Sequence, residues 1–236
     1  YCAVGGVEPQ SETVWRQSEK YGVPKIAFIN KMDRTGAEFY RVLDEMKSQL
    51  EANAVPLVIP IGAEENFEGV IDLIKMKKIT FDEASQGQKM IESEIPAELL
   101  EEAKKWRHNL IEKAAEQDDA LLEKYLGGED LNNEEVMRAV RKATIARSMV
   151  PVLCGTAFKN KGVQLILNAV VDYLPSPLDI PPVICAVEKE ANSRMADDKA
   201  PFSGMAFKIM SDKHMGKLTY IRIYSGTLSQ GEAVYN

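Results

Sequence analysis

Apolar residues follow two rhythms along this chain, one typical of buried strands and one typical of amphipathic helices. Residues 23–29 form a short apolar run bounded by turn residues, as in a strand that is covered on both faces. In residues 37–50 the apolar positions recur every three or four residues, which predicts a helix. Another helix is predicted over residues 9–21, with Pro9 in its first turn, after a strand that ends near Val4. The alternation of strand and helix predicts an α/β fold with a parallel sheet between helices.

The rhythm changes between residues 51 and 148. Strand patterns are predicted over 55–61 and 70–80, and helices over 97–117, 120–126 and 133–146. Residues 149–154 then read again as a buried strand and residues 163–173 as a helix. Residues 51–148 are therefore predicted to be an α+β insertion between two parts of one α/β domain, residues 1–50 and 149–174.

Prolines separate this domain from the rest of the chain. Pro175, Pro177, Pro181 and Pro182 predict an extended connector over residues 175–199. Beyond it, strands are predicted over 202–210, 217–225 and 233–235, with glycines at the turns. Residues 200–236 are accordingly predicted to be the start of an all-β barrel domain.

Charge is distributed unevenly along the chain. The whole chain carries a formal net charge of -7, and residues 51–148 hold 21 acidic and 13 basic residues, which is more than the entire excess. This balance argues against nonspecific or sequence-specific nucleic-acid binding. The acidic faces of the predicted helices have two interpretations, solvated helix surface or a site for a protein partner.

Composition and the chain start bound the class of protein. No apolar stretch approaches the roughly 20 residues that span a bilayer. Cys2, Cys154 and Cys185 fit neither a disulfide framework nor a zinc spacing, which favours a cytoplasmic protein. The start at Tyr1 has no initiator Met and no signal peptide, so we expect an internal segment of a longer protein.

The chemistry is concentrated in a short polar motif directly after the strand predicted at 23–29. The motif is Asn30-Lys31-Met32-Asp33. A fixed carboxylate such as Asp33 can accept both hydrogen bonds from the N1 and N2 donors of guanine, which adenine does not offer. Asn30 can reach the other purine edge and tie neighbouring loops, while the aliphatic stem of Lys31 can lie against the base.

A second loop follows the strand predicted at 149–154 and reads Gly155-Thr156-Ala157-Phe158. Its small residues permit close backbone approach, and a backbone N–H there can bond the guanine oxygen. Ligands bind at the carboxyl ends of parallel strands, so both loops are expected to converge on one base. Either motif alone also has a purely structural interpretation, with Asn30 and Asp33 capping a turn and a helix and the second motif forming a tight loop.

Longer runs around these motifs resemble bacterial-type translation elongation factor G. The similar runs are residues 3–17, 28–34, 157–164, 172–177 and 224–226, and the similarity extends over essentially the whole chain. The resemblance implies the carboxyl-terminal half of a P-loop-type GTPase domain with its inserted subdomain, followed by the start of the second, β-barrel domain. Asn30, Lys31 and Asp33 fall on the family's guanine-recognition motif, and Thr156, Ala157 and Phe158 on its second base loop. The family usually has Ser where Thr156 stands, which puts a hydroxyl contact in doubt.

The resemblance also implies what the whole protein does. It would be a ribosome-dependent GTPase that binds GTP and GDP with Mg²⁺, drives translocation of tRNA and messenger RNA, and contacts the ribosomal stalk through the acidic insertion. The alternatives left open are a mitochondrial elongation factor G, a ribosomal protection protein, or, for this chain alone, a non-catalytic interaction scaffold.

The phosphate-handling sequences of such a GTPase are absent from this chain. We find neither a G-x-x-x-x-G-K-[ST] loop nor an Asp-x-x-Gly segment that would sense the γ-phosphate. The chain is therefore expected to contain no catalytic residue and no metal ligand, and to be inactive by itself.

Overall fold

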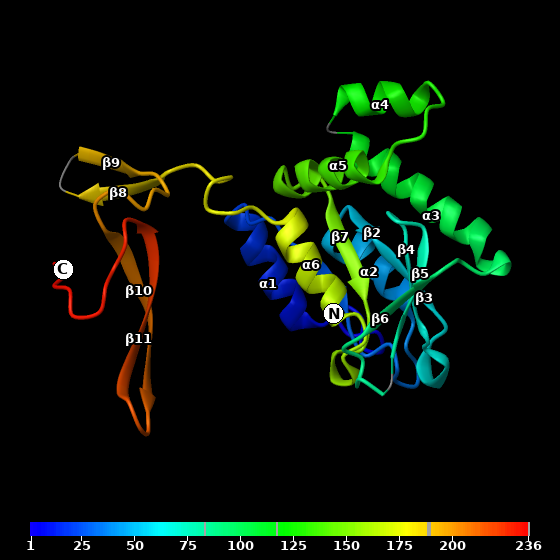
Figure 1. The fold of residues 1–236 in the computed structure, drawn as a ribbon, viewed down its shortest axis with the longest axis horizontal. Coiled ribbons are helices and arrows are strands. Elements are labelled where there is room, and N and C mark those ends of the chain that lie inside the picture. The colour runs from blue at the N-terminus through cyan, green and yellow to red at the C-terminus, as the bar shows by residue number, and fades with distance from the viewer. Residues whose placement is uncertain (83, 117, 188–189, 236) are drawn as a thin grey trace. The chain divides into compact units, whose positions relative to one another are not determined.

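A computed structural model of the chain describes residues 1–82, 84–116, 118–187 and 190–235. The chain forms two compact units, Tyr1–Leu174 and Pro175–Asn236, the second described to residue 235. Figure 1 shows the elements of each unit along the chain. Among the described residues, no helix is long and apolar enough to cross a membrane.

A parallel sheet of three strands lies at the centre of the first unit. Strands β1 (Ala27–Ile29), β7 (Val150–Cys154) and β2 (Ala54–Pro56) pair in the order β1-β7-β2. Every residue of β7 is buried, as expected of the middle strand of a sheet covered on both faces. Next to β1, Asn30 makes a parallel bridge with Cys2, and backbone hydrogen bonds join Tyr1 and Ala3 to Asn30. The strand predicted to end near residue 4 is represented by this short parallel pairing.

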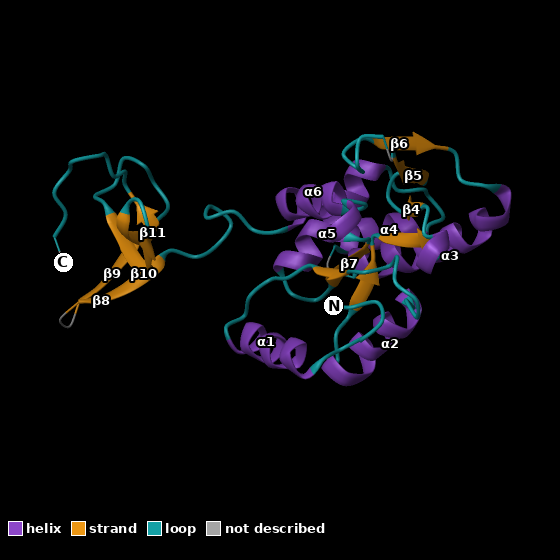
Figure 2. Cartoon of the chain, turned by 90° about the horizontal axis from the view of Figure 1, so that it is seen from below, coloured by secondary structure: helices purple, strands orange, loops and turns teal. Residues whose placement is uncertain are grey.

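Helices cover both faces of the parallel sheet. Figure 2 shows α1 (Pro9–Lys20) and α2 (Phe39–Leu50) on one side of the parallel strands, with α5 (Asn133–Ile145) and α6 (Val163–Tyr173) on the other. The buried residues of α2 are those of the predicted apolar stripe: Phe39, Val42, Leu43, Met46 and Leu50. The α/β fold predicted for this part of the chain is confirmed, and each of these helices lies within two residues of its predicted range.

A second sheet, antiparallel and of four strands, is built from the middle of the first unit. Strands β3 (Val58–Ile61), β4 (Gly69–Asp72), β5 (Lys77–Phe81) and β6 (Met90–Ser93) pair in sequence order. A 3-10 turn, η1 (Glu64–Asn66), lies in the connection between β3 and β4.

Three details of this region differ from the sequence-based expectations. The run 55–61 is not one strand: β2 pairs with β7, Leu57 N still donates to Val152 O at 2.9 Å, and β3 then pairs with β4 in the other sheet. The run 70–80 is a hairpin, because the Asp72 carboxylate accepts the backbone N–H groups of Ile74 and Lys75 and closes a turn. Strand β6 was not predicted, since its residues are largely exposed and show no apolar alternation.

Three helices follow β6, shown in green at one end of the first unit in Figure 1. They are α3 (Ala97–Ala115), α4 (Asp119–Leu126) and α5; residue 117, the predicted end of the first, lies outside the described residues. A capping box between Asn132 and Glu135 begins α5. Arg107 of α3 donates to the carbonyls of Leu73 and Ile74 and so ties the helix to the end of β4.

The second unit contains two antiparallel hairpins. They are β8 (Val183–Val187) with β9 (Glu190–Arg194), and β10 (Ser203–Asp212) with β11 (Gly216–Ser225). The first hairpin lies inside the connector predicted over 175–199, because the proline-rich part ends at Pro182 and leaves a strand-forming segment after it. No strand is formed at 233–235, so that prediction was wrong. The separate boundaries predicted for the insertion, the connector and the barrel stay predictions.

Candidate functional site

The two motif-bearing loops lie side by side because they follow neighbouring parallel strands. Ile29 at the end of β1 aligns with Cys154 at the end of β7. Hydrogen bonds continue the pairing into the loops: Gly155 N donates to Ile29 O at 3.0 Å and Met32 N donates to Gly155 O at 3.1 Å. The structure thus brings the two predicted motifs together at one edge of the sheet, as expected for carboxyl ends of adjacent parallel strands.

Asn30 links the two loops through its side chain. Its Oδ1 accepts the backbone N–H of Ala157 at 2.9 Å and that of Lys31 at 2.8 Å. Lys31 has a φ of 67°, in the left-handed region, so the chain turns sharply immediately after the strand. The predicted role of Asn30 as a tie between loops therefore has a direct structural counterpart.

Asp33 is held by two partners from the second loop. Thr156 Oγ1 donates to Asp33 Oδ1 at 2.7 Å, and Lys159 Nζ lies 3.2 Å from Asp33 Oδ2. Burial opposes ionisation of Asp33, but the hydrogen bonds from Thr156 and Lys159 and the charge of Lys159 outweigh it. The pKa of this carboxyl consequently lies below its ordinary value of 3.8.

The Asp33 carboxylate still has capacity for a ligand. Its side chain is 11% exposed, and two ionised oxygens offer about four acceptor positions, of which Thr156 and Lys159 use two. A carboxylate that is ionised, fixed and only partly satisfied suits a ligand edge with two neighbouring N–H donors.

Thr156 makes the hydroxyl contact that its departure from serine had put in doubt. The residue is 1% exposed, and its Oγ1 reaches Asp33 as the hydroxyl of a serine also can. The hydroxyl group therefore makes the contact with Asp33, and the additional methyl group of threonine takes no part in it.

Backbone donors of the second loop are already engaged within the protein. Gly155 N donates to Ile29 O, Thr156 N to Lys161 O, and Ala157 N to Asn30 Oδ1. A guanine oxygen that takes the Ala157 N–H has to share it with Asn30 or replace Asn30. The close backbone approach predicted for this loop is also internal, because a Cβ on Gly155 would lie 2.2 Å from Lys161 O.

Two of the predicted residues present exposed side chains. Phe158 is 91% exposed and lies in η2 (Ala157–Lys159), and the side chain of Lys31 is also exposed. An exposed aromatic ring and an aliphatic stem are surfaces against which a planar base can pack.

Three contacts of these loops were not predicted from the sequence. Lys159 pairs with Asp33. A basic residue three positions after Thr156, in a loop expected to meet Asp33, could have indicated this ion pair. Glu64 accepts the Gly36 N–H at 2.6 Å and donates its own N–H to Met32 O at 2.8 Å. Residues 33–36 also read Asp-x-x-Gly, but Asp33 bonds the second loop and Gly36 bonds Glu64, so this segment belongs to the turn after β1.

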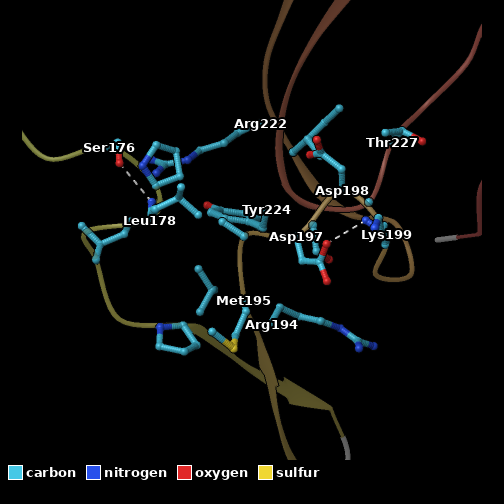
Figure 3. Close-up of a pocket in the computed structure, with 18 of the residues that line it drawn as sticks. Ser176, Leu178, Arg194, Met195, Asp197, Asp198, Lys199, Arg222, Tyr224 and Thr227 are labelled. Carbon is cyan, nitrogen blue, oxygen red and sulfur yellow. Dashed lines mark hydrogen bonds between the residues drawn. The ribbon is translucent and has the colours of Figure 1, made fainter. Parts of the chain in front are cut away.

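A cavity of about 930 Å³ lies in the second unit and is unrelated to these loops. Figure 3 shows its lining, with Arg194 and Arg222 among acidic and apolar side chains and Lys199 N donating to the Asp197 carboxylate. All its lining residues come from 176–228, so none of the predicted site residues takes part. The mixed charges of the lining select no particular ligand.

Acidic, histidine and cysteine side chains do not gather into a metal site in the described part of the chain. Within 1–82, 84–116, 118–187 and 190–235, no group of three or more His, Cys, Asp or Glu side chains is placed to hold a metal ion. The neighbours of the Asp33 carboxylate are a hydroxyl and an ammonium group, which suit hydrogen bonding to a base rather than coordination of a metal ion.

Comparisons with known proteins point to one family of proteins. Residues 1–176 match the family described as the elongation factor Tu GTP binding domain, and residues 201–236 match elongation factor G domain 2. A solved protein structure from Thermus thermophilus superposes on the chain with a TM-score of 0.77 at 27% sequence identity. The match covers 98% of this chain and 32% of the Thermus chain.

Proposed function

Because the chain belongs to the elongation factor Tu GTP-binding domain family, we propose that it reads guanine in a longer translational GTPase of the elongation factor G type. The match of residues 201–236 to elongation factor G domain 2 favours that type within the family. The chain spans 32% of the Thermus chain that it matches, so the activity proposed here is that of the whole protein.

The observation that carries the proposal is the geometry around Asp33. Its carboxylate is kept ionised by Thr156 and Lys159 and keeps acceptor positions for the N1 and N2 donors of guanine. Adenine has no matching pair of donors, so binding adenine would leave the remaining acceptor positions of the Asp33 carboxylate without hydrogen bonds. This cost gives the site its preference for guanine.

Other residues of the two loops complete the base site. Asn30 holds the loops together through Ala157 N and has an amide nitrogen that can donate to the purine. Lys31 and Phe158 supply exposed surfaces for the two faces of the base. The Ala157 N–H moves from Asn30 to the guanine oxygen, or is shared between them.

We assign hydrolysis to the whole protein. GTP is its substrate, and Mg²⁺ supplies charge neutralisation of the phosphates when bound. The residues of the present chain bind and orient the base, and we assign none of them to the phosphate chemistry.

The ribosome is the proposed partner of the whole protein, with translocation of tRNA and messenger RNA as its task. Residues 51–148 carry 21 acidic and 13 basic residues, a balance that repels RNA and suits a protein contact. We propose the ribosomal stalk protein as that contact.

Nucleotide titration of the whole protein tests the function. We expect calorimetry to show GDP bound much more tightly than ADP, and ribosomes to stimulate phosphate release from GTP. Equal binding of GDP and ADP, or none, would overturn the assignment and leave the scaffold alternative. Ribosome-stimulated hydrolysis without movement of messenger RNA would instead indicate a related translational GTPase, such as a ribosomal protection protein.

A further inference from the structure

The four-stranded antiparallel sheet β3–β6 touches both base loops through its connecting turns. The connection between β3 and β4 contacts the turn after β1, and the turn between β5 and β6 contacts the loop after β7. In Figure 1 the turn after β5 and the yellow-green loop after β7 lie together at the lower end of the first unit.

The first contact is made by Glu64. Its carboxylate accepts the Gly36 N–H at 2.6 Å, and its own backbone N–H donates to Met32 O at 2.8 Å. These two bonds enclose Asp33, which lies between Met32 and Gly36 in the sequence. A hydrogen bond to a charged acceptor is among the stronger kinds, so Glu64 restrains this turn from outside the parallel sheet.

The second contact is made by Gly87. A Cβ at Gly87 would lie 2.6 Å from Lys159 O and 3.0 Å from Asn160 O, so the turn is packed directly on the backbone of the second base loop. Gly87 has a φ of 77°, and its N–H donates to Asp82 O at 2.9 Å, which fixes the shape of the turn.

Gln164, at the start of α6, makes a hydrogen bond to the turn between β5 and β6. Its Nε2 donates to Gly87 O at 2.8 Å, while its Oε1 is buried and has no hydrogen-bond partner among the described residues. Burying an amide oxygen unsatisfied costs free energy, so the bond to Gly87 holds the side chain in a position that it would not otherwise favour.

We propose that Glu64, Gly87 and Gln164 are positioning residues for guanine recognition, through which the antiparallel sheet sets the spacing of Asp33 and its partners. The proposal rests on the function proposed above. Lys159 is the link on the second side, because its carbonyl faces Gly87 and its Nζ pairs with Asp33. A turn that moves away from this loop therefore loosens the ion pair at Asp33.

The test uses three variants of the whole protein, Glu64→Ala, Gly87→Ala and Gln164→Leu. Gly128→Ala is the matched control, because Gly128 has a φ of 83° but no atom of the described residues lies within 4 Å of its Cβ position. Alanine is strained at both glycines, and only at Gly87 does it collide with the base loop. Gln164→Leu removes the donor to Gly87 O and replaces it with a side chain of similar size, which keeps the test informative where Gly87→Ala fails to fold.

We expect Glu64→Ala and Gln164→Leu, which each remove a supporting hydrogen bond, to bind GDP about three- to tenfold more weakly. Gly87→Ala, which displaces the turn from the base loop, should weaken GDP binding at least as much, while Gly128→Ala binds as the unaltered protein does. Discrimination between GDP and IDP, which lacks the N2 amine, should fall, and amide exchange of residues 156–161 should rise. Folded variants with unchanged GDP affinity would overturn the proposal. So would equal losses for GDP and IDP, with or without faster exchange, because Asp33 would then still read the N2 amine as before. Failure of the unaltered protein to prefer guanine would instead overturn the proposed function.

Discussion

Replacing Thr156 by valine removes the hydrogen bond that Thr156 donates to Asp33 and leaves the other residues of the site unchanged. The side chain is 1% exposed, and its hydroxyl donates to Asp33 Oδ1 at 2.7 Å. Valine fills nearly the same volume without the donor. Bonds to charged groups are worth about 1.5–3 kcal/mol, and Lys159 still holds the other oxygen, so we take the lower end and expect about tenfold weaker GDP binding by the whole protein.

The same substitution should change the pH dependence of the site. In the unaltered protein the pKa of Asp33 is below 3.8, so its contribution to stability is present above that pH and is lost as pH falls through the lowered pKa. Removing the Thr156 hydroxyl raises this pKa. The contribution of Asp33 to stability is then lost at a higher pH on acidification.

Calorimetric titration with GDP, repeated on Thr156→Ser, makes the test specific. Serine keeps the hydroxyl and should bind GDP as the unaltered protein does, whereas valine should not. Equal GDP affinity of Thr156→Val and Thr156→Ser, in two folded proteins, would refute the role given to this hydrogen bond.

Three further predictions concern the isolated chain, the acidic helices and the core. The present chain alone should bind GDP with a dissociation constant of about 1 mM or weaker and release no phosphate from GTP, because base contacts barely exceed the cost of association; micromolar binding in a titration would contradict this. Replacing Glu98 and Glu112 of α3 by Gln should alter the stalk-stimulated rate of GTP hydrolysis by the whole protein without altering its affinity for GTP. A change in GTP affinity would instead place the insertion at the active site. Leu110→Ala should lower the free energy of unfolding by about 2–5 kcal/mol, because Leu110 is fully buried, and urea titration that shows no loss would contradict the packing described for α3.

The sequence predicted the elements whose burial follows a single period. The stripe on α2 and the run of β7 were expected, because each is set by residues close together in the sequence. The parallel pairing of β1 with β7 was expected from the alternation of strands and helices. This pairing is also what brought Asn30 and Asp33 next to Thr156 and Ala157.

The hydrophobic pattern did not predict the strands correctly where one apolar run contributes strands to two sheets, or where a strand is exposed. Residues 55–61 are apolar throughout, so nothing local indicates that the pairing partner changes after Leu57. Strand β6 has mostly exposed residues and therefore no burial pattern to detect. The hairpin of β8 and β9 was not predicted, because the prolines that precede it led us to expect an extended connector there.

The support of the base loops could not be predicted from local sequence. Glu64, Gly87 and Gln164 are far from Asp33 in the chain, and their contacts depend on how the antiparallel sheet is placed beside the parallel one. A single glutamate, glycine or glutamine carries no signal of that placement. Only the folded structure identifies them.

Asp33→Asn in the whole protein tests the central claim most directly. An asparagine amide can donate to the 2-oxo group of xanthine but cannot accept both donors of guanine, so the preferred base should change. Titration with GDP and XDP should show GDP weakened by about tenfold to a hundredfold and XDP strengthened. Asp44→Asn, an exposed change on α2, is the control and should leave both affinities unaltered. Unchanged affinity for GDP in the folded Asp33→Asn protein would contradict guanine recognition by this site.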